Sequence, residues 1–301
     1  MTYLGKVGEG QFSYKSTYKN GKPTHTYVIK RSGELEPYSE EKVIHSMERV
    51  GVPDALKPEV LKHIREQFKN GFLTTDQLFS YIYKYLDKSD KKASLRLNLR
   101  KAIFELGPTG FPFEKYLARI FQSQGYKTMV GARIMGECVM HEIDLVLEKD
   151  GKREIAEAKF HNDVGVRSDV QVALYTYARF LDVKVKNDIS KAWLITNTKL
   201  TLDAITYAQC KGISVLAWNY PNGGNLQQFV EDPQMYPITI LPDFTREEKQ
   251  FLIEDNIILC SDLLKLTDTE VRNFPMVKQT HLRRAILSAR SLLESTSATQ
   301  K

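Results

Sequence analysis

The sequence predicts an α/β protein in which a central domain of strands and helices lies between two mostly helical parts. Apolar residues recur at helical spacing between residues 40 and 106, strand and helix patterns alternate between 113 and 218, and helical spacing returns after 224. The 301 residues are about twice a usual domain length, so several compact units are expected. No apolar run reaches the roughly 18 residues of a membrane span, which excludes an integral membrane protein.

The N-terminal part begins with residues 1–25, which are rich in Gly, Ser, Thr and Lys and are expected to form a flexible segment. Residues 27–31 have the pattern of a short strand, and Ser39 is the expected N-cap of a helix that begins near Glu40. Residues 107–110, Gly-Pro-Thr-Gly, mark a domain boundary. Further helices are predicted by three apolar runs and by a segment after the polar break at 87–92; the runs pass through Val43, Met47 and Val50, then Val60, Ile64 and Phe68, then Leu78, Ile82 and Leu86.

The central part alternates between segments with the apolar spacing of helices and segments with the pattern of strands. A helix is predicted over 113–123 and another over about 169–181, with several strands between them. The runs 192–196 and 213–218 are mostly apolar and are separated by a helical stretch, as in the buried strands of an α/β sheet. We therefore expect a sheet covered by helices.

Charge and cysteine content set broad limits. Lys and Arg outnumber Asp and Glu by 43 to 37, and the pI near 9.0 fits either a polyanionic partner or a generically basic protein. The beginning of the chain lacks the pattern of a secretory signal, so a cytoplasmic location is expected. Cys138, Cys210 and Cys260 are odd in number and far apart, which predicts reduced thiols acting as small buried hydrophobic residues.

One β-hairpin carries the chemistry that the sequence predicts. Strand patterns over 143–149 and 152–159 flank Asp150-Gly151, one of the strongest signals for a two-residue turn. Pairing of the residues next to the turn fixes the register and sets Asp144 opposite Glu157 on one face of the hairpin.

Directly opposed like charges are destabilising, so a nearby cation is expected. Lys159 follows Glu157 by two residues and therefore projects to the same face as the two carboxylates. Hard oxygen ligands beside an ammonium group suit Mg²⁺ or Mn²⁺ and phosphodiester cleavage. The alternative is that these are solvated strand residues paired with Lys159. The opposite face is predicted to be packed and to consist of Ile143, Leu145, Leu147, Ala156 and Ala158.

The runs 107–114, 141–144 and 157–162 together resemble the Mrr-type restriction endonuclease domains of the PD-(D/E)XK nuclease superfamily. The resemblance covers roughly residues 104 to 220. A lone acidic-x-Lys motif is common by chance, whereas an ordered helix Glu, hairpin Asp and Glu-x-Lys are much more specific. The fold implied is a restriction-endonuclease-like α/β/α core with a mixed sheet.

The resemblance also implies roles for five residues. Asp144 and Glu157 would be metal ligands, Lys159 the catalytic lysine, Glu114 a helix acid that supports the site, and Gln171 a glutamine often found near it. Many relatives carry a cysteine between the glutamate and the lysine, where this chain has alanine. That side chain points away from the carboxylates, so the departure leaves the predicted activity unaffected.

Two histidines and a cysteine lie near these motifs. His141 and His161 could be auxiliary ligands or contact phosphate, although a lone histidine is usually structural. Cys138 and His141 have a spacing that invites a zinc hypothesis, but no second close pair of ligands follows, and structural zinc is rejected.

Residues 26–103 resemble the ATP-cone, a nucleotide-binding regulatory module, most clearly over the run 28–43. The resemblance implies that Val28, Lys30, Arg31 and Lys42 contact ATP or dATP. The three cationic side chains among them could bind the triphosphate group. The alternative is an ordinary basic hairpin on a helical bundle. Because no Walker A sequence is present, the nucleotide is expected to act as a ligand rather than a P-loop substrate.

The C-terminal part, most clearly residues 251–286, faintly resembles helix-hairpin-helix DNA-binding modules, although the hairpin glycine is absent. A charged helix face is more often simply solvated. The basic residues that could contact phosphates are Arg272, Lys278, His281, Arg283 and Arg284.

The leading hypothesis is therefore a nucleotide-regulated, metal-dependent DNA endonuclease, acting on modified or foreign DNA and capable of forming a homo-oligomer. The rival is a non-catalytic ATP- or dATP-sensing regulator that binds DNA through a nuclease-like fold. A nucleotide-reducing enzyme is set aside, because the rest of the chain supplies neither the length nor the paired cysteines. The expected organisation is a flexible segment 1–25, an ATP-cone 26–103, a nuclease domain 104–222 and a small helical C-terminal unit 223–301 that could bind DNA.

Overall fold

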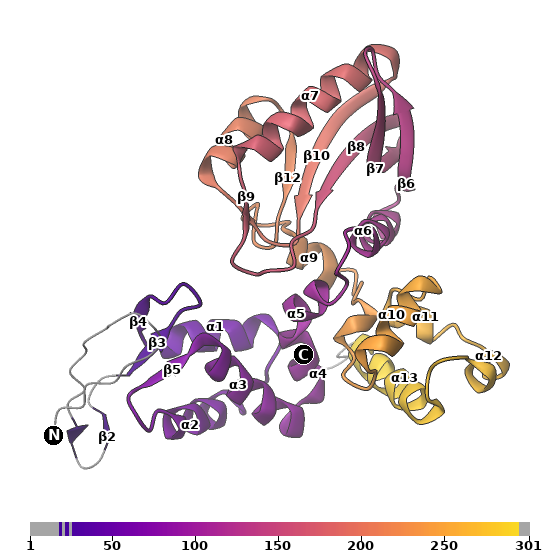
Figure 1. The fold of residues 1–301 in the computed structure, drawn as a ribbon. Helices are drawn as coiled ribbons and strands as arrows, with labels where there is room; N and C mark the ends of the chain where they lie inside the picture. Colours follow the sequence, from indigo (N-terminus) through magenta and orange to yellow (C-terminus); the bar gives the residue numbers. More distant parts are fainter. Residues whose placement is uncertain (1–17, 20–21, 24–25, 295–301) are drawn as a thin grey trace, which may run out of the picture. The chain divides into compact units, whose positions relative to one another are not determined.

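The computed structural model describes residues 18–19, 22–23 and 26–294, and the chain divides into two compact units after Asn98 (Figure 1). Most of the predicted flexible segment 1–25 lies outside the described residues. Its described positions form a two-stranded ladder of β1 (Tyr18–Lys19) and β2 (Lys22–Pro23).

The first unit combines a small sheet with four helices. Strand β3 (Tyr27–Ile29) pairs antiparallel with β4 (Leu35–Pro37) and parallel with β5 (Phe72–Thr74). The predicted cap is confirmed, since the Ser39 hydroxyl accepts a hydrogen bond from the Lys42 backbone N–H. The helices are α1 (Glu40–Arg49), α2 (Lys57–Gln67), α3 (Thr75–Ser89) and α4 (Lys91–Leu97).

The predicted apolar runs form the core of this unit, in which Met47, Ile64 and Leu86 are fully buried. Strand β5 was not foreseen from the sequence. It has three residues, too few to show a period of two, and Thr74 at its end also caps α3.

The second unit is built on a five-stranded sheet in the order β12-β10-β8-β7-β6. Strands β6, β7 and β8 are antiparallel, while β8, β10 and β12 run parallel, so the sheet is mixed as expected. A separate parallel pair consists of β9 (Arg167–Ser168) and β11 (Lys199–Leu200). The strands of the large sheet are β6 (Lys127–Met135), β7 (Met140–Lys149), β8 (Lys152–Lys159), β10 (Ile189–Thr196) and β12 (Ser214–Leu216).

Helices cover both faces of this sheet. Trp193 of β10 packs its ring against Phe121 of α6, with centroids 5.6 Å apart. Its neighbour Ala192 faces the other way and packs with Phe180 and Val183 of α7. Helices α7 and α8 lie side by side on that second face (Figure 1). The helices are α5 (Leu99–Phe104), α6 (Phe111–Ser123), α7 (Val170–Lys186) and α8 (Leu202–Cys210), and the result is an α/β/α core.

The hairpin β7–β8 has the predicted turn and register. Asp150 and Gly151 both have positive φ, 51° and 72°, as a two-residue hairpin turn requires. The ladder runs from Lys149↔Lys152 to Leu145↔Ala156 and ends there, one pair before Asp144 and Glu157.

The side-chain alternation of β7 breaks at this point. Ile143 was predicted to share a face with Leu145 and Leu147, and this is wrong: it packs with Val146 and Ile155 against α7. The neighbouring ladder with β6 is interrupted at the same place, because Gly131 has a φ of 65° and no partner between the pairs Val130↔Leu145 and Ala132↔Ile143. An interruption in strand pairing changes the direction in which the neighbouring side chains point. Here the side chains next to Asp144 depart from strict alternation.

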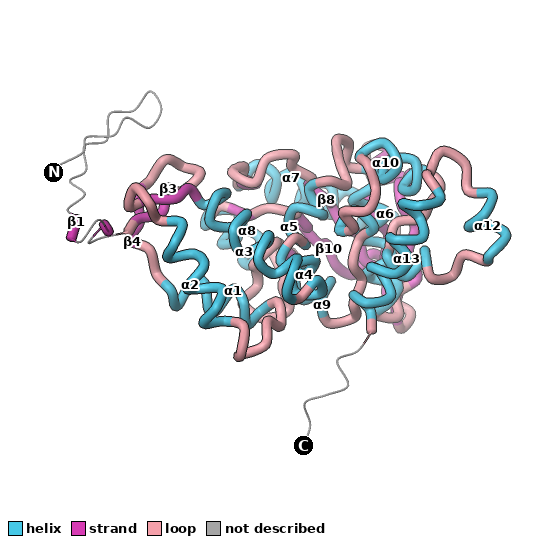
Figure 2. Tube along the Cα trace, turned by 90° about the horizontal axis from the view of Figure 1, so that it is seen from below, coloured by secondary structure: helices cyan, strands magenta, loops and turns pink. Residues whose placement is uncertain are grey.

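The C-terminal region is helical, as predicted, and packs on the α/β/α core. The Tyr116 hydroxyl of α6 donates to the Met235 carbonyl at 2.7 Å, and Thr239 Oγ1 donates to the Ala102 carbonyl at 2.6 Å. Arg119 forms an ion pair with Asp262, with Nη2 and Oδ1 2.7 Å apart. The elements are α9 (Leu226–Glu231), the 3₁₀ helix η1 (Ile238–Ile240), α10 (Arg246–Glu254), α11 (Cys260–Leu263), α12 (Asp268–Asn273) and α13 (Gln279–Leu293), of which α9, α10, α12 and α13 are labelled in Figure 2.

The cysteines are free, as expected, but only one is a buried hydrophobic residue. Cys260 is buried, whereas Cys138 lies in the turn between β6 and β7 and Cys210 at the end of α8, where both are exposed. No helix in the described ranges is long and apolar enough to cross a membrane.

Candidate active site

Three carboxyl groups from three elements lie close together in the second unit. Asp144 is on β7, Glu157 on β8, and Glu114 in the first turn of α6. Burial raises the pKa of Glu114 to about 7, with further contributions from the charges of Asp144, Glu142 and Glu157. Glu114 is therefore half-buried and lies within electrostatic range of the other acidic groups at this end of the sheet.

Asp144 is held in place by the backbone of the neighbouring strand. Its Oδ2 accepts a hydrogen bond from the Ala158 N–H at 2.7 Å, just beyond the last ladder pair. Burial raises the pKa of Asp144, while this hydrogen bond and the charge of Arg179 work in the opposite direction. The carboxylate thus stands where the two strands cease to pair.

Glu157 is mostly buried and is bound by a residue that the sequence did not single out. Burial and the charge of Asp144 raise its pKa, and the charges of Arg179 and Lys159 oppose this rise. Arg179 of α7 donates from Nη1 to Glu157 Oε2 at 2.5 Å, and the two side chains are only 13% and 16% exposed. The cation bound to Glu157 is therefore Arg179, whereas the predicted Lys159 acts on the two carboxylates through its charge.

Lys159 ends β8 and is exposed. Its charge acts on both Asp144 and Glu157, so the three groups that were predicted to converge are electrostatically coupled. A sequence signal for Arg179 did exist, because it interrupts the apolar run Ala178-Arg179-Phe180-Leu181 on a helix that was expected to cover the sheet.

Gln171 lies in the first turn of α7, where its backbone N–H donates to the capping carboxylate of Asp169 at 3.0 Å. Its side chain is exposed, and among the described residues no hydrogen bond joins it to the acidic cluster. Glu114, Asp144, Glu157 and Lys159 are brought together, whereas the Gln171 side chain is not joined to them by a hydrogen bond within the described ranges.

The loop before α6 is fastened to the end of β8. Asn162 donates from Nδ2 to the Pro108 carbonyl at 3.0 Å, and the Phe113 and Phe160 rings lie 5.5 Å apart. A Cβ on Gly107 would meet Asn162 Oδ1 at 2.6 Å and the Phe160 ring at 2.8 Å, so this approach requires glycine. These contacts set the start of α6, and with it Glu114, against the hairpin.

The two histidines near the site have structural partners. His161 Nε2 and Ser168 Oγ form a hydrogen bond with the two atoms 2.9 Å apart. The His161 backbone N–H donates to Asn197 Oδ1 at 2.9 Å. Burial and the charge of Lys159 lower the pKa of His161.

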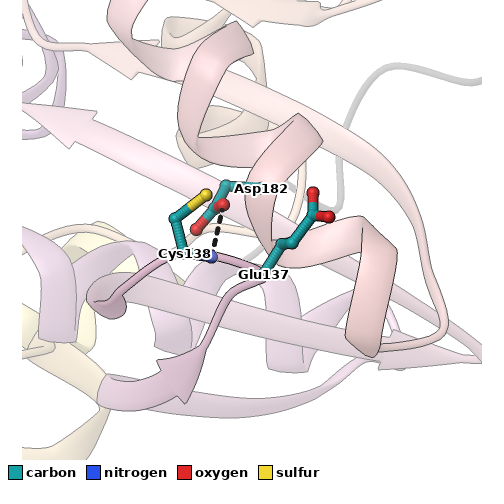
Figure 3. A group of neighbouring side chains, drawn as sticks. All are labelled: Glu137, Cys138 and Asp182. Carbon is teal, nitrogen blue, oxygen red and sulfur yellow. Dashed lines mark hydrogen bonds between the residues drawn. The ribbon is translucent and has the colours of Figure 1, made fainter.

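His141 belongs to a second polar cluster, between α7 and the turn that joins β6 and β7. Figure 3 shows three other members of this cluster, Glu137, Cys138 and Asp182. Its Nε2 lies 2.7 Å from Asp182 Oδ2, and the Cys138 N–H donates to Asp182 Oδ1 at 2.9 Å. The pKa of Asp182 falls to about 2, chiefly because of the bond with His141 and then of that with the Cys138 backbone.

The ligand atoms of Glu137, Cys138 and Asp182 lie within 4.8 Å of one another. Asp182 comes from α7, 44 residues after Cys138, so the spacing of Cys and His residues along the sequence does not reveal it. Hydrogen bonds already account for Asp182 as the tie between the turn and the helix. We assign it that structural role.

In the first unit, two of the predicted nucleotide-binding cations meet on one carboxylate. Lys30 and Lys42 both form ion pairs with Glu36, which lowers the pKa of Glu36 to about 2. Arg31 instead pairs with Asp76 of α3, with Nη2 and Oδ1 2.6 Å apart. Val28 is buried in the core of the unit.

Among the five basic residues predicted to contact phosphates, His281 is partly buried and the side chains of the other four, including Lys278, are exposed. His281 Nδ1 lies 2.9 Å from Glu248 Oε2, and the Lys278 backbone N–H also donates to Glu248. Arg272, Arg283 and Arg284 are exposed. DNA binding by this region stays a prediction.

The acidic cluster fits a divalent cation by the chemistry of its donors. Asp144 and Glu157 supply carboxylate oxygens from two adjoining strands, which are the ligands that Mg²⁺ and Mn²⁺ prefer. Burial is the main cause of the raised pKa of Glu114, and the charges of Asp144, Glu142 and Glu157 add to it, so a bound cation would offset the repulsion among these carboxylates.

Comparisons with known proteins place these residues inside a matched domain. A restriction endonuclease family model matches residues 108–221, and an "AF1548-like, C-terminal" model matches residues 236–295. An uncharacterized protein of Archaeoglobus fulgidus is 37% identical over 156 residues, which are 52% of this chain and 88% of that protein. The solved structure of AF1548, a protein of unknown function, is similar at 33% identity with a TM-score of 0.54, covering 61% of this chain and 98% of that one.

Proposed function

The chain belongs to the family of AF1548-like proteins, and we propose that its second unit is a metal-dependent endonuclease that hydrolyses phosphodiester bonds in DNA. The observation that carries this proposal is the convergence of Glu114, Asp144 and Glu157 beside Lys159, within the segment 108–221 that matches a restriction endonuclease. Buried carboxyl groups with raised pKa values in such a segment are typical of catalytic sites.

The four residues would have distinct roles. Asp144 and Glu157 would hold Mg²⁺ or Mn²⁺, which supplies a Lewis acid for the phosphate and a more acidic water. Lys159, exposed at the end of β8, would face the phosphate and neutralise charge that gathers on it. Glu114 would hold or accept a proton near neutral pH, in keeping with its pKa. Gln171 would join this group only through contact with bound DNA.

We propose further that the first unit is an ATP-cone that regulates the nuclease. Lys30 and Lys42 already share one anionic partner, Glu36. The phosphates of ATP or dATP would replace the Glu36 carboxylate as the partner of these two lysines. Regulation requires that ATP or dATP bind one state of the protein more tightly than another. The domains would be 26–103, 104–222 and 223–301, and the DNA would be foreign or modified.

The test is cleavage of supercoiled plasmid DNA with Mg²⁺ or Mn²⁺. Asp144→Asn and Lys159→Met are expected to abolish nicking while the thermal unfolding transition stays near that of the wild type. Glu148→Gln, an exposed residue of the same β7 strand, serves as the matched control and should remain active. Full activity in both site variants would overturn the proposal.

A DNA-binding regulator that senses ATP or dATP is the second candidate. The observation in its favour is the ion pair between Arg179 and Glu157, which occupies an oxygen that a metal would need. Salt-dependent DNA binding with no cleavage under any metal would favour this function.

A further inference from the structure

Arg179 is tightly enclosed yet incompletely bonded. Its Nη1 donates to Glu157, its Nη2 donates to the Tyr175 hydroxyl, and its guanidinium carbon lies 4.5 Å from the centre of the Tyr175 ring. Its Nε is buried and has no hydrogen-bond partner in the described part of the chain. A buried donor without a partner is costly, so this arrangement is not the best that the guanidinium can make.

The position of Arg179 conflicts with a metal at the same carboxylate. Glu157 is one of two proposed ligands, and the arginine occupies its Oε2 at 2.5 Å. Arginine keeps its charge in proteins, so it cannot leave by losing a proton. A guanidinium that releases Glu157 therefore needs another anion or water.

The geometry offers a route toward solvent. Tyr175 is 52% exposed and holds the outer edge of the guanidinium, while Glu157 holds another edge in the interior. A change in the side-chain torsion angles of Arg179 would move the guanidinium away from Glu157 and toward solvent, while it stays in contact with the Tyr175 ring. Planar guanidinium groups bind phosphate oxygens with two parallel hydrogen bonds.

We propose that Arg179 is an exchanging counter-ion: it occupies Glu157 while the site is free of metal and turns to a DNA phosphate when a divalent cation takes its place. This inference rests on the proposed function. It means that metal and DNA phosphate bind cooperatively, because each binding step supplies what the other requires.

The first experiment measures Mn²⁺ affinity by titration calorimetry on the full chain. Arg179→Met removes the competing cation, and Mn²⁺ should bind about tenfold more tightly than to the wild type. In the double variant Arg179→Met with Glu157→Gln this gain should vanish. Lys184→Met removes the same charge from an exposed position on the same helix and should leave the affinity unchanged.

A purely structural role of Arg179 predicts no gain in Mn²⁺ affinity when the arginine is removed. If Arg179 only holds Glu157 in position, then Arg179→Met should bind Mn²⁺ as the wild type does or more weakly, and this result would overturn the proposal. Arg179→Lys keeps a charge and should bind Mn²⁺ like the wild type. Circular dichroism of each variant checks that the fold is retained.

The second experiment tests the exchange with phosphate, in a Lys159→Met background in which cleavage is blocked. A short DNA duplex should tighten Mn²⁺ binding severalfold when Arg179 is present and should have no such effect in Arg179→Met. Equal tightening in both would overturn the exchange.

The two proposals fail in different ways. If the wild type binds Mn²⁺ and cuts DNA but Arg179→Met shows no gain in affinity, only the exchange is wrong. If Arg179→Met binds Mn²⁺ more tightly through Glu157 and no variant cuts DNA, the exchange stands and the endonuclease proposal is overturned. Absence of Mn²⁺ binding in both proteins would overturn both.

Discussion

Asp144 accepts a hydrogen bond from the backbone N–H of Ala158 at 2.7 Å, so this carboxylate serves the fold as well as the proposed chemistry. The contact determines which substitution isolates the chemistry. Asparagine keeps an oxygen acceptor for the Ala158 N–H, whereas alanine leaves that N–H without its partner.

We therefore expect Asp144→Ala to lower the free energy of unfolding by about 1–3 kcal/mol relative to Asp144→Asn, the cost of an unsatisfied buried donor. Urea denaturation of the two variants measures this difference. Neither variant should cleave DNA. Equal stability of the two would mean that the hydrogen bond does not contribute to the folded state.

The pKa of Glu114 makes stability depend on pH in a defined direction. Its folded-state pKa of about 7 lies above the ordinary value of 4.5, so the folded protein holds this proton more tightly than the unfolded chain. The resulting stability is fully present below pH 4.5 and is lost as the pH rises through 7. Glu114→Gln, which never ionises, should gain stability relative to the wild type over this window.

Denaturation of wild type and Glu114→Gln at several pH values checks this expectation. Glu148→Gln is the control, because Glu148 is exposed on β7 and should show a constant difference. A difference between wild type and Glu114→Gln that does not change with pH would contradict the assignment. Added Mg²⁺ should reduce the difference by neutralising Asp144 and Glu157.

Glu36 is expected to compete with a nucleotide for the cations of the first unit. Because it pairs with both Lys30 and Lys42, replacing it by glutamine should raise the affinity for ATP or dATP several-fold. Lys30→Met should lower the affinity. Equilibrium binding of a fluorescent ATP analogue measures both, with Glu34→Gln, an exposed residue of the same hairpin, as the control. Weaker binding by Glu36→Gln would contradict this model of the nucleotide site.

Tyr116 connects the α/β/α core to the C-terminal region through a buried hydrogen bond to the Met235 carbonyl. Tyr116→Phe keeps the ring and removes the donor, so the free energy of unfolding should fall by about 1–2 kcal/mol. Tyr207→Phe makes the same substitution at a partly exposed residue of α8 and should change the free energy of unfolding less than Tyr116→Phe does. Chemical denaturation should show one transition for the second unit, and loss of the C-terminal helices alone would show that they form a separate cooperative unit.

Much of the fold follows from local patterns. The Asp150-Gly151 turn determined the register of the hairpin, and Ser39 determined the start of α1, because each depends on residues a few positions apart. The break at Asp144 coincides with the interruption at Gly131 in the neighbouring strand, which the pattern of the hairpin alone does not reveal. Arg179 was missed for a similar reason, because its partner lies 22 residues away across a helix–sheet contact.

The same distances along the chain have a consequence for the order of folding. Asp144 and Glu157 are joined by a two-residue turn, so their strands can meet through contacts that close a very short loop. Arg179 arrives only when α7 docks on the sheet, a later and less local event. Before α7 docks, repulsion between the two carboxylates is therefore offset on the hairpin by Lys159 and not yet by Arg179, and millimolar divalent salt or mild acidity should accelerate the earliest step in refolding the second unit.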